Sequence, residues 1–214
     1  FAAFAASAYG KLTGTPAACL TIAGPGATNL FTGMWDAKVD RAPLLALTVQ
    51  VATQVVGTGN FQEVDLVSAF SSVADFNHRV QADSPHAELM GLSIKHAILN
   101  KDVSHLTFPD EVQVLPANNS IASNSEGRMP NLAISPPKEE LNKATELIKK
   151  AKKPTIIIGH GARNASQEIL NFAEKIGAPI MTTFKAKGAV ADSHPIQIKA
   201  SCSCFDFEFV HSDS

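Results

Sequence analysis

Short, continuous apolar runs constrain the fold of this chain more than any other feature of its sequence. Five such runs stand between turn-forming residues, at 17–23, 43–51, 103–108, 154–158 and 179–184. Runs of this kind suit strands that are buried in a parallel sheet. Helical patterns separate them, at 1–12, 27–39, 65–70, 86–99, 139–150 and 167–176. Strands that alternate with helices indicate right-handed crossovers, so we expect an α/β protein built from parallel sheets.

A change in composition divides the chain into two parallel-sheet α/β domains. Residues 118–137 are rich in Asn, Ser and Pro and show little apolar periodicity, which is typical of a linker. We therefore expect a first domain at 1–117, a linker at 118–138, and a second, truncated Rossmann-like domain at 139–196. Residues 197–214 form an atypical tail, in which FDFEF predicts an edge strand and the polar end predicts disorder.

Charge and cysteine content exclude several classes of function. The formal net charge is -2, which gives no basic footprint for nucleic acid. No apolar run reaches the ~18 residues that a membrane-spanning helix needs. Cys19, Cys202 and Cys204 make no disulfide framework, and the opening residues lack the basic region of a signal peptide. We therefore expect a protein of a reducing compartment, the cytoplasm, without a membrane span or a nucleic acid partner.

A glycine-containing turn lies between the first predicted strand and the helix that follows it. Its residues are Gly24, Pro25 and Gly26, with Asn29 shortly after. In an open parallel sheet this position is the carboxyl edge, where ligands bind, and glycines let the backbone approach a ligand closely. The same pattern is typical of a tight turn that binds nothing, and spacing alone leaves both interpretations open.

Two further segments carry candidate site residues. Phe61, Gln62 and Glu63 lie in the predicted loop 52–63, where polar side chains can project into a site, although such a pair is usually solvated surface. Residues 159–162 (GHGA) follow a predicted strand and match half of a dinucleotide-binding fingerprint, without its third glycine. The seven histidines show no metal-ligand spacing, so no metal site is predicted.

An ordered series of motifs along 1–195 resembles one enzyme family. FAAFAASAYGKLTG, AGPGATNL, DAKVDRAPLLALTVQV, NFQE and FPDEV follow one another as in the pyrimidine-binding domain of thiamine-diphosphate-dependent enzymes. GHGARNASQE and FKAKGAVADSHP resemble the central domain of bacterial pyruvate oxidases. Acetolactate synthases share GPGATNL and FQE, so both subfamilies stay open. The FPDEV, GARN and AKGAVAD segments favour pyruvate oxidase.

The resemblance implies a reaction and a set of binding residues. The cofactor, thiamine diphosphate, attacks a 2-keto acid such as pyruvate through its thiazolium ring and holds the carbanion after carbon dioxide leaves. In this family the positions of Gly24, Pro25, Gly26 and Asn29 line the aminopyrimidine ring. The positions of Phe61, Gln62 and Glu63 approach the reacting centre, and the resemblance implies that Gln62 touches the substrate or an intermediate.

The central-domain resemblance implies a flavin site. In flavin-containing members the segment that contacts FAD corresponds to Gly159, Gly161, Ala162 and Arg163. Thr183 and Lys187 belong to the next segment of that resemblance. Some members keep this domain without the flavin, so FAD enters here as a hypothesis.

Two parts of the family's catalytic machinery have no counterpart in this sequence. The family's catalytic glutamate stands immediately before the position of Phe1. Its diphosphate and Mg²⁺ site, a Gly-Asp-Gly motif followed by Asn, belongs to a third domain, and no Gly-Asp-Gly occurs here. We therefore expect that this chain alone does not turn over substrate. Active sites of the family lie between subunits, which implies a homodimer or homotetramer for the full protein.

Three interpretations of the function follow. The first is part of a decarboxylating oxidoreductase of the pyruvate oxidase type. The second is part of an acetolactate synthase-like carboligase, a transferase or lyase. The third is a degenerate module that keeps the fold for binding and has lost the chemistry.

Overall fold

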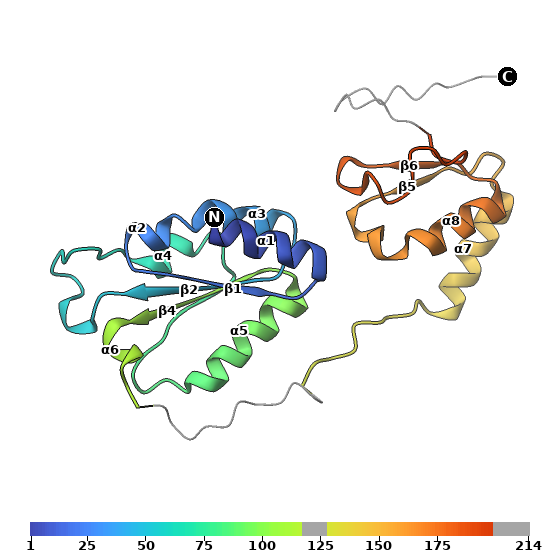
Figure 1. Ribbon diagram of the computed structural model, residues 1–214. Coiled ribbons are helices and arrows are strands. Elements are labelled where there is room, and N and C mark those ends of the chain that lie inside the picture. Colours follow the sequence, from blue (N-terminus) through green and yellow to red (C-terminus); the bar gives the residue numbers. More distant parts are fainter. Residues whose placement is uncertain (117–127, 199–214) are drawn as a thin grey trace. The chain divides into compact units, whose positions relative to one another are not determined.

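The computed structural model describes residues 1–116 and 128–198, and the chain divides into two compact units (Figure 1). The first unit is Phe1–Asn131 and the second is Leu132–Ser214. The predicted FDFEF strand, the predicted polar end and residues 118–127 of the predicted linker lie outside the described residues. The domain limits given above stay predictions.

The first unit is a four-stranded parallel sheet with helices on both faces. Its strands are β1 (Ala17–Thr21), β2 (Leu44–Gln50), β3 (Phe76–Arg79) and β4 (Val103–Pro109), in the order β1-β2-β4-β3. Its helices are α1 (Ala2–Thr13), α2 (Pro25–Thr28), α3 (Phe31–Val39), α4 (Leu66–Phe70), α5 (His86–Asn100) and α6 (Asp110–Gln113), with the short 3-10 helix η1 (Thr53–Val55). Figure 1 shows α1 to α4 on one side of the sheet and α5 on the other. The predicted parallel α/β architecture is confirmed.

The structure differs from the sequence-based expectations in two places in this unit. The predicted helix 27–39 is two helices in the structure. The first of them, α2, begins earlier than expected, at Pro25, and two residues separate it from α3. Proline suits the first turn of a helix, where its fixed φ is favourable and its missing N–H has no partner in any case. Strand β3 was not expected because its sequence, FNHR, has no apolar run. It forms at an edge of the sheet, where burial is incomplete.

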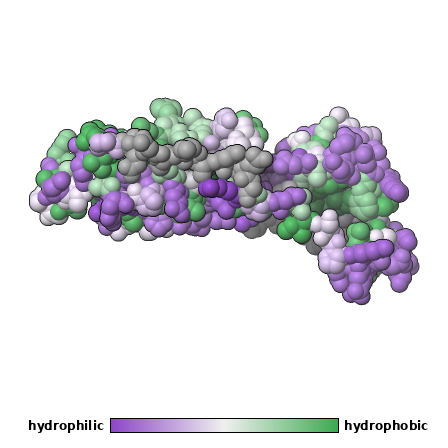
Figure 2. Space-filling model, turned by 90° about the horizontal axis from the view of Figure 1, so that it is seen from below, coloured by the Kyte–Doolittle hydropathy of each residue, from purple (hydrophilic) through white to green (hydrophobic). Residues whose placement is uncertain are grey.

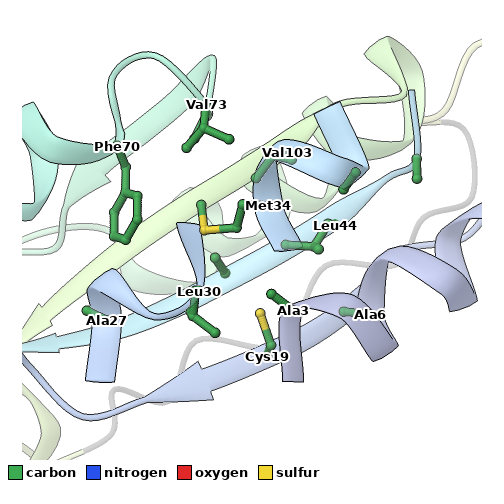
Figure 3. Packing of buried hydrophobic residues seen from close by; sticks show 14 of the residues in the cluster. Ala3, Ala6, Cys19, Ala27, Leu30, Met34, Leu44, Phe70, Val73 and Val103 are labelled. Atoms are coloured by element: carbon green, nitrogen blue, oxygen red, sulfur yellow. The ribbon is translucent and has the colours of Figure 1, made fainter. Parts of the chain in front are cut away.

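The core between the sheet and the first helices depends on small side chains (Figure 3). A Cβ added to Gly33 of α3 would lie 2.6 Å from the Cβ of Ala3 in α1, so the two helices touch closely. Lys11 Nζ lies 2.7 Å from a carboxylate oxygen of Asp36 and 2.7 Å from one of Asp40, which ties the end of α1 to α3. The Ala-rich sequence of α1 therefore serves close helix packing as well as helix propensity.

The second unit contains a smaller β-α-β arrangement. Its elements are α7 (Lys138–Lys150), β5 (Ile156–Ile158), η2 (His160–Ala165), α8 (Ser166–Ile176), β6 (Ile180–Thr182) and η3 (Phe184–Ala186). β5 and β6 pair in parallel, and Ile180 forms one further parallel bridge with Gln197. Ile158 and Ile180 are the largest members of the buried cluster that forms this unit's core. The parallel pairing confirms the crossover predicted for this part of the chain.

No helix in the described ranges, 1–116 and 128–198, is both long and apolar enough to cross a membrane. On the face shown in Figure 2, hydrophilic residues are interleaved with hydrophobic ones. The longest described helix is α5, with 15 residues.

A fully buried histidine lies in the first unit with both ring nitrogens paired. His105 Nε2 lies 2.8 Å from Thr48 Oγ1, and Nδ1 lies 2.7 Å from Asn77 Oδ1. Because an amide oxygen only accepts, Nδ1 carries the proton and Nε2 accepts from the threonine hydroxyl. Phe70 meets the imidazole edge-on, with 4.6 Å between ring centroids. Burial lowers the pKa of His105 to about 4, since the charged form would lose its hydration.

Acidification should destabilise the first unit before most carboxylates titrate. In the unfolded chain the pKa of His105 returns to 6.5, so below that pH the unfolded state takes up a proton that the folded state excludes until about pH 4. We expect the free energy of unfolding to fall by about 2 kcal/mol between pH 7 and pH 5. Urea unfolding followed by the fluorescence of Trp35, the single tryptophan, measures this change. The fall should be much smaller in His105→Gln, and an equal fall in both proteins would contradict the assignment.

Candidate functional site

Two segments that the sequence singled out separately meet at the carboxyl edge of the first sheet. Gly24 follows β1 and has a φ of 63° and a ψ of -125°, a conformation that favours glycine. A Cβ added there would lie 2.9 Å from the Cα, Cβ and backbone oxygen of Gln62. Gln62 itself has a φ of 65°, and non-glycine residues in this region cluster at functional sites. The glycine turn and the Phe61–Glu63 segment therefore form one local structure.

The other residues of the glycine turn have different surroundings. Pro25 is the first residue of α2 and is exposed. A Cβ added to Gly26 would lie 2.5 Å from Ile22 Cγ2, so only glycine fits without movement there. Asn29 is exposed and ends α2. The turn thus presents its backbone at the sheet edge while the side chains of its flanking residues face solvent.

The neighbours of Gln62 in the loop point elsewhere. Phe61 is 84 % exposed. The Glu63 carboxylate turns back and accepts from the backbone N–H of Gly57, and from those of Gly59 and Asn60 at 3.1 Å each. These hydrogen bonds lower the pKa of Glu63, because they stabilise its charged form. In this structure Glu63 holds the shape of the loop, and its predicted contact with the reacting centre stays a prediction.

Sequence analysis missed a row of hydroxyl groups beside the glycine turn. Thr21, Thr48 and Thr107 stand opposite one another on three adjacent strands, so their side chains share one face of the sheet. Among the described residues, the Oγ1 atoms of Thr21 and Thr107 are buried and have no hydrogen-bond partner. Unpaired buried hydroxyls of this kind suit a ligand that can hydrogen-bond to them. The recurrence of threonine near the carboxyl ends of the three predicted strands of the first domain was the signal available in the sequence.

The second unit brings its own predicted residues together at the carboxyl ends of β5 and β6. Gly159 follows β5 and Thr183 follows β6, and a Cβ on the glycine would lie 3.9 Å from Thr183 Oγ1. Arg163 Nη1 lies 2.8 Å from His160 Nε2, and His160 Nδ1 lies 3.4 Å from the carbonyl oxygen of Lys185. The segments 159–163 and 183–187 are therefore neighbours.

The segments 159–163 and 183–187 together form the second cluster, and the other predicted residues of the second unit belong to it. Gly161 has open space around it, since a Cβ there would meet no atom within 4 Å. Ala162 packs against the buried cluster of the unit, and Lys187 is exposed at the end of η3. The arrangement leaves backbone and one guanidinium group at a sheet edge where a phosphate-bearing ligand can approach.

Among the residues that the structure describes, no group of three or more His, Cys, Asp or Glu side chains is placed to hold a metal ion.

Comparison with known proteins identifies both units. A family model described as "Thiamine pyrophosphate enzyme, N-terminal TPP binding domain" matches residues 1–69. A second, described as "Thiamine pyrophosphate enzyme, central domain", matches residues 141–203. The first match includes the glycine turn and the Phe61–Glu63 segment, and the second includes both segments of the second cluster.

Individual relatives point the same way. The protein YdaP of Bacillus subtilis, whose name calls it thiamine pyrophosphate-containing, is 40 % identical over 198 residues, which is 91 % of this chain and 34 % of YdaP. The pyruvate oxidase of Lactiplantibacillus plantarum is 33 % identical, over 90 % of this chain and 32 % of that protein. A chloroplastic acetolactate synthase of Arabidopsis thaliana is also 33 % identical, over 87 % of this chain and 28 % of that enzyme.

The chain spans about a third of the length of these relatives. Both of its units are covered by models of one family, and the order of motifs along the sequence agrees with that match. The chain therefore belongs to the thiamine pyrophosphate enzyme family, with an N-terminal domain and a central domain of that family.

Proposed function

We propose that this chain supplies the pyrimidine-binding side of the active site of a thiamine-diphosphate-dependent enzyme that decarboxylates a 2-keto acid such as pyruvate. The observation that carries the proposal is the contact between Gly24 and Gln62 at the carboxyl edge of the first sheet. It places a glycine-lined backbone and the candidate substrate-contacting side chain in one local structure, inside the segment that matches the family's binding domain.

The residues at this edge fit a flat, hydrogen-bonding ring. Gly24 and Gly26 allow Gln62 and Ile22 to pack directly against the turn, and among the described residues the buried Oγ1 atom of Thr21, beside Gly26, has no hydrogen-bond partner. The side chain of Gln62 can then orient the substrate by hydrogen bonds. When bound, the cofactor supplies an electron sink for the bond that breaks on decarboxylation.

We propose that the binding site for Mg²⁺ and the diphosphate group lies in another domain, the one that carries the Gly-Asp-Gly motif in this family. The described residues offer the metal no ligand set, and the motif does not occur in this sequence. The residues of this chain would therefore contribute to binding of the ring and of the substrate rather than of the metal.

FAD is proposed at the second cluster. Gly159 and Gly161 leave the backbone accessible beside Thr183, and Arg163 offers a cation at the same sheet edge. Ala162 and Lys187 complete the set that the family resemblance implies. A phosphate-bearing cofactor fits this arrangement, because backbone N–H groups and a guanidinium are the groups that recognise phosphates.

An acetolactate synthase-like carboligation is the second candidate function. It rests on the equal identity, 33 %, of the chain to a pyruvate oxidase and to an acetolactate synthase. Both proposals share the thiamine diphosphate ring, since both units of this chain match models of thiamine pyrophosphate enzymes. Assembly into a homodimer or homotetramer and a location in the cytoplasm remain proposals, as does a binding role without catalysis.

Saturation-transfer NMR on the cofactor tests the proposed function with this chain as it stands. We expect weak binding, with transfer from the protein to the aminopyrimidine protons and no strengthening when Mg²⁺ is added. Absence of transfer to those protons at millimolar cofactor would contradict the proposed ring site. Binding that strengthens with Mg²⁺ would instead contradict our assignment of the diphosphate to another domain.

A further inference from the structure

One buried side chain closes the loop that carries Gln62. Gln50, the last residue of β2, is 1 % exposed. Its Nε2 donates to the carbonyl oxygen of Val64, and its Oε1 accepts from the N–H of Val51 at 2.9 Å. Val51 and Val64 are the two ends of the loop, so a single carboxamide joins them.

The ladder of the sheet ends at the base of this loop. In the register of β2 and β4, Gln50 stands opposite Pro109, which is the last residue of β4 and has no N–H to donate. Immediately after that proline the chain turns into α6. The backbone of 51–64 therefore needs other partners at its base, because a buried backbone group left unpaired costs about 1–3 kcal/mol.

The other restraints on the loop act farther from its buried base. The Glu111 carboxylate accepts from the N–H of Thr53 at 3.1 and 3.2 Å, and Glu63 accepts from N–H groups at the tip. Both of these interactions are exposed to solvent. Val64 lies two residues from Gln62, so the bond from Gln50, together with the packing of Val64 against the core, restrains the chain close to the contact with Gly24.

We propose that Gln50 is a positioning residue, whose carboxamide holds the Gln62 turn against Gly24 at the carboxyl edge of the sheet. It acts through the backbone of the loop and touches no ligand itself. The proposal depends on the proposed function only in taking thiamine diphosphate as the ligand that the turn contacts. The position of the turn can be measured without any ligand.

The test replaces Gln50 by methionine, which has a similar length and no strong hydrogen-bonding group. In isotopically labelled protein, the nuclear Overhauser cross-peak between the α protons of Gly24 and Gln62 reports their contact. We expect this cross-peak to disappear in Gln50→Met, and affinity for thiamine diphosphate to fall about tenfold. Ser104→Ala is the matched control, because Ser104 is buried on the neighbouring strand β4 but donates to the backbone of α5 and not to the loop.

Each outcome decides something. A cross-peak that persists in Gln50→Met overturns the proposal, and so does one that is lost equally in Ser104→Ala, which would indicate general loosening. If the wild-type chain shows no transfer to the cofactor ring, the proposed function fails while the cross-peak still tests Gln50. Should Gln50→Met not fold, Gln50→Asn keeps a carboxamide but sets it about 1.5 Å short, and the same cross-peak is compared.

Discussion

Replacing Gly24 by alanine should lower the free energy of unfolding of the first unit by about 2–4 kcal/mol and abolish binding of the cofactor ring. The added Cβ would lie 2.9 Å from three atoms of Gln62, one of them its backbone oxygen, so rotation of a side chain cannot relieve the clash. The φ of 63° and ψ of -125° add strain of their own. In Gly24→Ala, either the loop that carries Gln62 moves away from the glycine turn, or the folded state remains strained.

Gly14→Ala is the control for this experiment. Gly14 also has a positive φ, 72°, but a Cβ there would meet no atom within 4 Å. It should therefore cost only about 1 kcal/mol and leave ring binding unchanged. Urea unfolding by Trp35 fluorescence and saturation transfer to the cofactor give the two readouts. Equal losses in the two variants would show that the contact with Gln62 has no role beyond backbone conformation.

Phe70→Ala should be among the most destabilising single changes in the first unit. The Phe70 side chain is fully buried, stacks on Phe31 with 6.0 Å between ring centroids, and meets His105 edge-on. Truncating a buried phenylalanine to alanine costs about 3–5 kcal/mol, from lost apolar contact and from the cavity left behind. This is a large share of the about 5–15 kcal/mol that stabilises a typical domain.

The same chemical change at an exposed position separates burial from residue type. Phe61→Ala removes a ring that is 84 % exposed, and should change the unfolding free energy by about 0.5 kcal/mol or less. Urea midpoints monitored through Trp35 compare the two variants. Similar midpoints for Phe70→Ala and Phe61→Ala would mean that the core around His105 is not packed as described.

The elements that could be predicted from the sequence are those whose residues carry an unmistakable local signal. The apolar runs at 17–23 and 43–51 became β1 and β2 with only their ends trimmed. Strand β3 could not be found this way, because its polar residues are acceptable only at a sheet edge that tertiary structure defines. The break near Asn29 was also missed, although Thr28 and Asn29 are weak helix formers.

The candidate site was predictable in its parts and not in its assembly. The sequence shows that position 24 is a glycine in a turn after a strand. Its partner Gln62 lies far along the chain, and glutamine has no preference for a positive φ. The role of Gln50 could not be predicted from the sequence, because a glutamine at the end of an apolar run is typical of an ordinary strand end. Its importance follows only from Val51 and Val64 being brought together by folding.

The carboxamide of Gln50 also limits how this region of the protein can diversify. Because one side chain joins Val51 to Val64, the distance between the two ends of the loop is set, whatever residues lie in between. Side chains at exposed positions such as Gln54 can be exchanged in libraries, whereas a residue inserted or deleted between Gln62 and Val64 would shift Gln62 against Gly24. Variants of this loop should therefore keep the spacing between Gln62 and Val64 constant.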